Sequence, residues 1–171
     1  VDTKSLCTGM ALLVIKACEM RDAGLPAKEI AEQIALLREK VHTTFILNTL
    51  DYLSRGGRCS AVTAFGANLL SIKPSIEMVD GALEVGKKYR GKIETVYGQY
   101  IRDQLSDPDK LDLSRAFLSH SGGGISEETL QAMKKEILRC APFQEVQIIR
   151  AGCTISAHCG PKTATVMFME K

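Results

Sequence analysis

The spacing of apolar residues predicts alternating helices and strands along the first part of the chain. Residues 5–23 are strongly apolar and are followed by Gly24, a residue suited to end a helix. A second helix is predicted to begin near Pro26. Its apolar face consists of Ile30, Ile34, Leu37 and Val41. Residues 43–47 then have the continuous apolar character of a buried strand.

This first part does not account for a complete domain. Two helices and one strand cannot close a sheet-based core, so we predict that residues 1–56 are the back half of an N-terminal α/β domain, a fragment of a larger unit. At its end, Gly56 and Gly57 can both adopt the left-handed conformation that terminates a helix. Such a turn would aim Arg58 in a fixed direction, whereas the alternative is a helix end with solvated arginines.

The second part of the chain changes from helical to strand periodicity. Asp80-Gly81 is a typical two-residue hairpin turn between strands at 72–79 and 82–87. The other predicted elements are helices at 61–70, 92–105 and 126–140, the last capped by Ser126, and strands at 116–118, 144–150 and 163–169. We therefore predict a mixed α+β fold of the α/β class, in which residues 57–171 form a C-terminal mixed-sheet domain with flanking helices.

Composition narrows the class of protein. The 171 residues are 45% apolar, which is enough to bury a core. The 22 Lys and Arg residues nearly balance the 20 Asp and Glu residues, without long runs of one charge, so no broad nucleic-acid or membrane-surface footprint is expected. The apolar stretch 10–15 is too short to span a bilayer and follows no secretory signal, so we predict a cytoplasmic protein without stable membrane insertion.

The six cysteines lack the spacing of a disulfide framework or of a paired metal-ligand motif. Cys153, His158 and Cys159 are close in sequence, but a fourth ligand is missing. We expect free thiols and no metal or other cofactor.

Two local patterns suggest binding of an anion. The turn Ser121–Gly124 opens a helix and could present backbone N–H groups to a phosphate, although it lacks the Lys-Ser/Thr ending of a P-loop and also fits an ordinary turn. A cationic patch could form if the hairpin folds back toward the turn at 55–58, and would suit an anionic ligand or an acidic partner; a solvated face explains it equally well. Its members would be Arg55, Arg58, Lys73, Lys87, Lys88 and Arg90.

A third candidate is His158, which stands beside Gly160-Pro161 in what we predict to be a fixed loop, residues 156–163, entering the last strand. There it could make one oriented hydrogen bond or be purely structural. We find no local nucleophile and base arrangement and no GxSxG, HExxH or paired-carboxylate motif. An enzyme is therefore the weaker hypothesis.

Four ordered motifs resemble the DegV family of bacterial fatty-acid-binding proteins, which includes the lipid-carrying subunits of fatty acid kinase. They are YLSRGGR at 52–58, LLSIKP at 69–74, KYRGK at 88–92, and Ala-Gly at 151–152 followed by Ser-x-His-x-Gly-Pro at 156–161. The resemblance covers essentially the whole chain, beginning with Asp-Thr-Lys at 2–4 and Gly9.

The resemblance implies a non-catalytic carrier that holds one long-chain fatty acid in a tunnel at a domain boundary. A separate kinase subunit would phosphorylate the bound carboxylate. It assigns His158 to the hydrogen-bond network at the carboxyl group and adds Ser156, Gly160 and Gly9 as ligand-binding positions. Arg58 and Arg90 are associated with the head-group region and with docking onto the kinase.

Three positions depart from the family pattern. Cys7 stands where serine is usual and Ala11 where a second glycine is usual, which would reshape the space beside the first helix. Lys162 replaces a glycine, at a position where a positive φ is expected, and adds a cation that could pair with a carboxylate.

Two other functions remain open from the sequence. One is a phosphate- or nucleotide-handling enzyme domain that uses the Ser121–Gly124 turn. The other is an interaction module that self-associates through exposed surface.

Overall fold

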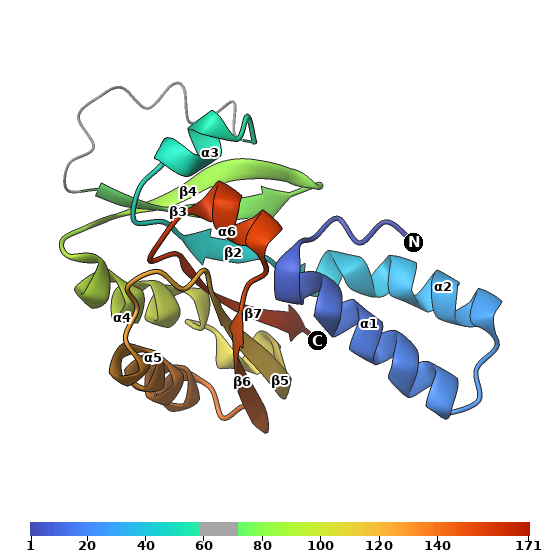
Figure 1. Cartoon of the computed structure of the whole chain (residues 1–171). Coiled ribbons are helices and arrows are strands. Elements are labelled where there is room, and N and C mark those ends of the chain that lie inside the picture. Colours follow the sequence, from blue (N-terminus) through green and yellow to red (C-terminus); the bar gives the residue numbers. More distant parts are fainter. Residues whose placement is uncertain (59–71) are drawn as a thin grey trace.

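The fold is described by a computed structural model that covers residues 1–58 and 72–171, so the helix predicted at 61–70 lies outside the described residues (Figure 1). The helices are α1 (Cys7–Asp22), α2 (Ala27–Leu37), α3 (Asp51–Arg55), α4 (Ile93–Gln104), α5 (Glu127–Cys140) and α6 (Cys153–Cys159), with short 3-10 turns at Arg38–Lys40 and Pro108–Lys110. The strands are β1 (Val41–His42), β2 (Thr44–Ile46), β3 (Ile72–Val79), β4 (Ala82–Arg90), β5 (Leu111–His120), β6 (Glu145–Arg150) and β7 (Ala164–Glu170).

These strands form one mixed sheet in the order β4-β3-β2-β7-β5-β6, and β1 pairs with β7. The pairs are antiparallel except for β5 and β6, which are parallel and are joined through α5. A parallel pair needs such a crossover, whereas β3 and β4 need only the turn at Asp80-Gly81. The predicted mixed sheet with flanking helices is confirmed.

The sheet extends across the boundary that the sequence suggested at residues 56 and 57. Strand β2 lies between β3 and β7, so a strand from the first part of the chain is central to a sheet that the second part completes. The division into an N-terminal remnant, 1–56, and a C-terminal domain, 57–171, stays a proposal about domain organisation.

Alternating side chains along the central strands form a separate core on each face of the sheet. Ala116 and Leu118 of β5 belong to the core beneath α4 and α5, whereas Phe117 between them packs with α1. Strand β2 divides in the same way, because Ile46 joins the α4 and α5 core and Phe45 packs under α3 and α6. Figure 1 shows α4 and α5 side by side on their face, with α3, α6 and the α1–α2 hairpin elsewhere around the sheet. The period-2 pattern thus builds cores on both faces.

Several local predictions are confirmed and others are wrong. The hairpin at residues 72–90 is present, and the Ser126 hydroxyl accepts the backbone N–H of Thr129 as the predicted cap of α5. Val41 was assigned to the second helix but lies in β1, because α2 ends at Leu37. Residues 153–159, part of which was predicted as a loop, form α6.

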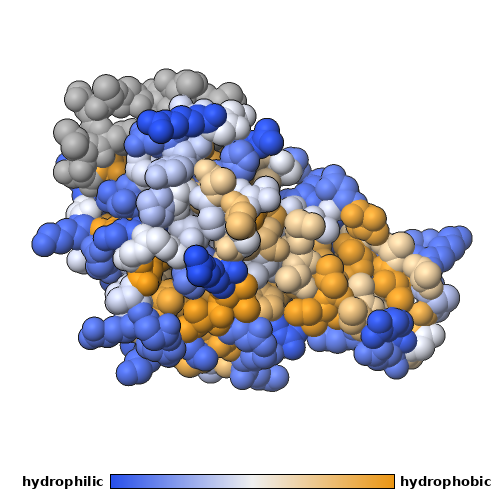
Figure 2. All heavy atoms as spheres, viewed as in Figure 1, coloured by the Kyte–Doolittle hydropathy of each residue, from blue (hydrophilic) through white to orange (hydrophobic). Residues whose placement is uncertain are grey.

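The α1–α2 hairpin carries exposed apolar side chains. Figure 2 shows hydrophobic residues gathered over this part of the molecule. The exposed large hydrophobic side chains of the N-terminal segment and of α1 and α2 are Val1, Met10, Val14 and Leu36. A contiguous apolar surface of this kind is typical of an interface. Self-association through it stays a prediction.

Neither a membrane span nor a metal cluster is found in the parts of the chain that the structure describes. No helix there combines the length and apolar character needed to cross a bilayer. Within the same residues, no three His, Cys, Asp or Glu side chains gather where they could hold a metal ion.

We expect the ion pairs of Glu136, with Arg139 on the same helix and with Arg102 of α4, to make stability depend on acid pH. Arg139 and Arg102 hydrogen-bond the Glu136 carboxylate and lower its pKa to about 2. Because this folded-state pKa lies below the ordinary value of 4.5, the stabilisation is complete above pH 4.5 and is lost as pH falls toward 2. Glu136→Gln should lower the free energy of unfolding at pH 7 by about 1 kcal/mol.

Urea unfolding at pH 7 and pH 3 would check this expectation. The difference between Glu136→Gln and the parent protein should shrink at the lower pH. The control is Glu128→Gln, an exposed position on the same helix. A difference that is equal at both pH values would contradict the assignment to Glu136.

Candidate ligand-binding site

The turn after α3 has the backbone of a helix end. Gly57 has a φ of 63°, and the N–H groups of Gly57 and Arg58 donate to the carbonyls of Ser54 (3.1 Å) and Leu53 (3.2 Å). Gly56 remains in the right-handed region at φ −75°. Of the two glycines that can adopt the left-handed conformation, only Gly57 does so. Arg58 is exposed at the end of this turn.

Gly56 is needed for a different reason, which is its contact with His158. A Cβ atom at Gly56 would overlap with Nδ1 of the half-buried imidazole in the last turn of α6. One residue past this helix, Gly160 has a φ of 74°, and a Cβ there would overlap with the Tyr52 ring of α3. Helices α3 and α6 thus approach each other through two glycines, and this approach fixes the place of His158.

Ser121 ties the segment after α6 to the end of β5. Its Oγ donates to the carbonyl of Gly160 (2.5 Å) and accepts the N–H of Thr163 (3.2 Å). Ser156, earlier on α6, donates its Oγ to the carbonyl of Ala151 (3.3 Å). Of the predicted ligand-binding positions, Ser156 and Gly160 therefore hold the backbone that carries His158.

The structure does not support a phosphate site at the Ser121–Gly124 turn. The N–H of Ser121 donates to the carbonyl of Thr163, and the N–H of Gly122 donates to Nδ1 of His120. A Cβ at Gly123 would meet Pro161, which packs against the turn. Two of the backbone donors that a phosphate would need are therefore bonded within the protein, and Pro161 covers part of the turn.

The His120 bond also fixes the state of that imidazole. Because Nδ1 accepts a hydrogen bond, the proton of the neutral ring is on Nε2. Burial, followed by the nearby Arg150 guanidinium, lowers the pKa of His120. Its imidazole is therefore neutral at pH 7.

Lys162 adopts the positive φ expected at its position, 61°. Tyr97 of α4 donates its hydroxyl to the Lys162 carbonyl (2.7 Å), and the Lys162 ammonium donates to Glu94 (2.8 Å). This hydrogen bond lowers the pKa of the Glu94 carboxyl. The cation introduced by Lys162 is thus paired with a carboxylate of this chain.

The predicted cationic patch is divided between the two faces of the sheet. Lys73 lies opposite Tyr89 in the register of β3 and β4, on the face of α4. Lys87 is also directed to α4, where it pairs with Asp103 (2.7 Å). Arg90 follows Tyr89 on the strand and points to the opposite face, the one covered by α3 and α6.

The cations on the two faces also have different surroundings. The Lys73 ammonium donates to the carbonyl of Asn48 (2.7 Å), and its burial, reinforced by the charge of Lys162, lowers its pKa. Arg58 and Arg90 are exposed. Arg55 is exposed as well. The six cations thus do not form one surface, and a partner-binding role for Arg58 and Arg90 stays a prediction.

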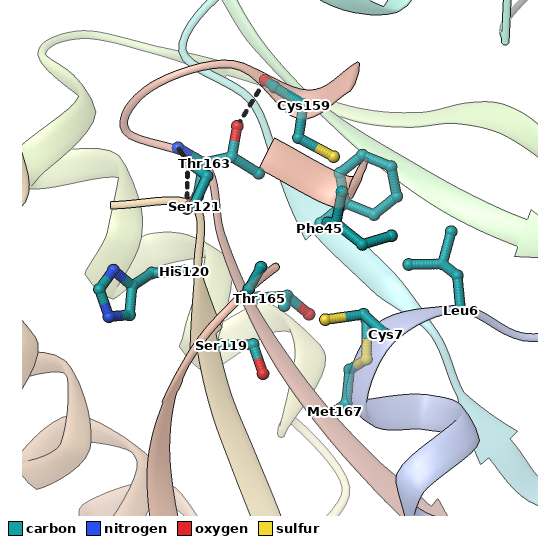
Figure 3. A pocket seen from close by; sticks show the side chains of 12 residues that line it. Leu6, Cys7, Phe45, Ser119, His120, Ser121, Cys159, Thr163, Thr165 and Met167 are labelled. Carbon is teal, nitrogen blue, oxygen red and sulfur yellow. Dashed lines mark hydrogen bonds between the residues drawn. The ribbon is translucent and has the colours of Figure 1, made fainter. Parts of the chain in front are cut away.

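A small cavity lies where the start of α1, strand β2, helix α6 and strand β7 meet (Figure 3). Its volume is about 20 Å³, room for roughly one water molecule. The lining residues are Leu6, Cys7, Phe45, Ser119, His120, Ser121, Ala151, Ile155, Cys159, Thr163, Thr165 and Met167. Figure 3 shows the His120 ring turned away from the cavity, whereas Cys7, Phe45 and Met167 converge on it.

The cavity is apolar even though several hydroxyl residues line it. Thr163 donates to the carbonyl of Cys159 (2.8 Å), and Thr165 donates to the carbonyl of Thr44. Ser119 is bonded to the hydroxyl of Thr8 (2.7 Å), and Ser121 holds the Gly160 turn. Because these hydroxyls are used internally, the free surface consists of methyl, methylene, aromatic and sulfur groups.

Sulfur atoms contribute to the cavity from two distant parts of the sequence. Burial, followed by the proximity of Cys7, raises the pKa of the Cys159 thiol to about 11. Cys159 is therefore an uncharged thiol at neutral pH, and it acts as a small apolar residue. Both cysteines are free.

Gly9 is the remaining predicted site residue, and the structure places it away from this cavity. A Cβ at Gly9 would overlap with the hydroxyls of Ser5 and Thr43, which bond each other at 2.6 Å. Gly9 therefore allows the first turn of α1 to pack closely against the start of β2.

Comparison with known proteins gives the family. The model of the DegV family, described as an uncharacterised protein family, matches residues 1–171. The chain belongs to the DegV family. A DegV domain-containing protein of Clostridium perfringens is 31% identical over 172 residues, which are 99% of this chain and 57% of that protein. The chain thus spans less than two thirds of the length of the relatives it matches.

Solved DegV structures share this fold. A Thermus thermophilus DegV family protein, described for its fatty acid binding, is 26% identical, with a TM-score of 0.82 over 100% of this chain and 60% of that one. A Eubacterium eligens DegV protein loaded with heptadecanoic acid has a TM-score of 0.84 at 22% identity, over 100% of this chain and 60% of that one. The fatty acid kinase (Fak) B3 protein of Streptococcus pneumoniae, loaded with linoleic acid, has a TM-score of 0.83 at 23% identity, over 100% and 59%.

Sequence reasoning found the DegV motifs but missed the contacts that join them. The pairing of Gly56 with His158 and of Tyr52 with Gly160 links two motifs about a hundred residues apart. The cavity was also missed. Its one signal is the period-2 spacing of hydroxyls at Ser119 and Ser121 and at Thr163 and Thr165, which places them on one face of two adjacent strands.

We expect Gly56→Ala to displace His158. The new methyl group would overlap with the imidazole, so either the ring or α6 must move, at a cost of about 1–3 kcal/mol. The control is Gly152→Ala at the start of α6, where a Cβ meets no atom within 4 Å. Thermal unfolding and the NMR shifts of the His158 ring would measure both effects. Unchanged His158 shifts in a fully stable Gly56→Ala protein would contradict the contact.

Proposed function

We propose that this chain is part of a non-catalytic carrier that binds a long-chain fatty acid and presents its carboxylate to a partner kinase. The observation that carries the proposal is the apolar cavity, which is lined by Ile155 and Cys159 of α6, the same helix that carries His158. His158 does not itself line this cavity, and its ring contacts Gly56. The fatty acids bound by DegV relatives support the same ligand class. The alternative, a phosphate- or nucleotide-handling enzyme domain, is not favoured because the Ser121 and Gly122 N–H groups are bonded within the protein and Pro161 packs against Gly123.

Apolar burial would supply most of the affinity for such a ligand. Each buried CH₂ contributes about 0.8 kcal/mol, so an acyl chain needs no charged partner along its length. The cavity holds about 20 Å³, far less than a pocket for a ligand of this size, which measures roughly 300–1,000 Å³. The cavity would therefore take only the end of the acyl chain, and the rest would be enclosed by parts of the longer protein outside this chain.

The polar end of the ligand would lie near α3 and α6. His158 has a fixed position there, since Gly56 admits its ring and Ser156 and Gly160 anchor the backbone on either side. An imidazole can donate one hydrogen bond to a carboxylate. We propose this role for His158, with no further cofactor. In the longer protein, residues outside this chain would complete the head-group site.

Arg58 and Arg90 suit the docking of an acidic partner surface. Both are exposed, and Arg90 points to the face of the sheet that α3 covers. Exposed arginines accelerate association with an acidic surface and make it sensitive to salt. We propose that they contact the kinase subunit.

We expect His158→Ala to weaken binding of a fatty acid such as palmitic acid by roughly 10-fold to 100-fold, the value of a hydrogen bond to a charged group. The control is His42→Ala, because His42 does not line the cavity and bonds Gln104 (2.7 Å). Native mass spectrometry of the protein at its full natural length, combined with lipid extraction, would measure occupancy. If no form bound a fatty acid of any common chain length, the carrier hypothesis would be rejected.

We expect Arg58→Glu and Arg90→Glu to weaken docking onto the kinase subunit without loss of fatty acid binding. The reversal of charge should lower the association rate most at low salt. Lys28→Glu, an exposed substitution on α2, is the control. Surface plasmon resonance at two salt concentrations would measure the rates. Docking that is equal for all three variants would exclude these arginines from the interface.

A further inference from the structure

Cys7 lines the cavity from the start of α1, and its backbone conformation is unusual. It begins α1 with a φ of 51°, in the left-handed region that a residue with a Cβ rarely adopts. The backbone therefore aims its side chain in a fixed direction. Figure 3 shows this side chain directed at the cavity, between Thr165 and Met167.

The start of α1 cannot move outward to widen the cavity. Thr8, the next residue, bonds its hydroxyl to Ser119 of β5 (2.7 Å) and to the sulfur of Met167 of β7 (3.3 Å). Gly9, which follows Thr8, packs directly against the hydroxyl of Thr43. The first turn is thus bonded to β5 and β7 and packs against the residue between β1 and β2. The width of the cavity on this side depends on the size of the side chain at position 7.

The opposite wall is equally fixed. Cys159 is 6% exposed, and its carbonyl accepts the Thr163 hydroxyl (2.8 Å), so the end of α6 is tied to the start of β7. Phe45 comes from β2, which is held between two neighbouring strands. Among these walls, the residue at position 7 is the one whose backbone would favour a smaller side chain, since glycine adopts positive φ without strain.

We propose that Cys7 is a specificity-determining residue, whose thiol limits how far an acyl chain can enter the cavity. The inference rests on the proposed fatty acid binding and assigns a role within it to this residue. The thiol is compact and apolar, so it limits length without repelling the chain. A smaller residue at position 7 should admit more of the chain, and a larger one less.

The test is the binding profile of saturated fatty acids from 12 to 20 carbons, measured by native mass spectrometry and by fluorescent-fatty-acid displacement on the protein at its full natural length. Cys7→Gly should shift the preferred length upward, with about a fourfold gain in affinity for each extra CH₂ that is buried. Cys7→Leu should shift the preference downward. Cys18→Ala is the control, because Cys18 lies on the same helix but does not line this cavity.

The outcomes separate the inference from the function on which it rests. Opposite shifts for the glycine and leucine variants, with an unchanged Cys18→Ala profile, would support the assignment. Fatty acid binding with the same profile in every variant would overturn the role of Cys7 and leave the carrier function intact. Absence of binding in the parent protein would overturn both. Thermal unfolding would check that each variant is folded. Cys7→Gly should relieve backbone strain, so this variant remains informative even if Cys7→Leu does not fold.

Discussion

The close approach of α3 and α6 is the constraint on which the candidate site depends. It is possible because the contacting positions are glycines: Gly56 admits the His158 ring and Gly160 admits the Tyr52 ring. Helices with a Cβ at both contacts would have to separate, and the imidazole would then lose its fixed position. The DegV motifs at 52–58 and 156–161 therefore pack against each other, and the glycines of each motif are needed because of the side chains of the other.

Internal hydrogen bonds explain how hydroxyl residues can line an apolar cavity. A buried hydroxyl without a partner is unfavourable by about 1–3 kcal/mol, so each one must be bonded within the protein. Here the bonds from Thr163, Thr165 and Ser121 connect β5, β7, β2 and the end of α6 across the base of the cavity. These bonds hold the walls in place and leave only apolar atoms for a ligand. The polar residues are thus the support of the cavity and not its recognition groups.

The sequence predicted those features that depend on local pattern. The hairpin at Asp80-Gly81, the Ser126 cap and the mixed sheet all follow from turn chemistry and periodicity. It failed where contacts between distant segments decide the structure. The segment at 153–159 is short and carries no helical signature, yet it forms α6 because Gly160 ends it and α3 packs against it. The cationic patch is divided for a similar reason, since strand register alone separates Lys73 from Arg90.

Two non-glycine residues in the left-handed region lie at the ends of the elements that border the site. Cys7 begins α1 and Lys162 follows the turn after α6, with φ values of 51° and 61°. Such conformations are unfavourable by about 1–2 kcal/mol and persist where the surrounding structure compensates. For Lys162 the compensation is visible in the bonds to Tyr97 and Glu94. For Cys7 the bonds belong to its neighbour Thr8, and Cys7 packs against an apolar cluster that includes Phe117 and Met167, so the strain is retained where the side chain faces the cavity. Lys162 is thus stabilised by its own bonds, whereas Cys7 is not. We therefore connect the side chain at position 7 with the cavity and not with the stability of α1.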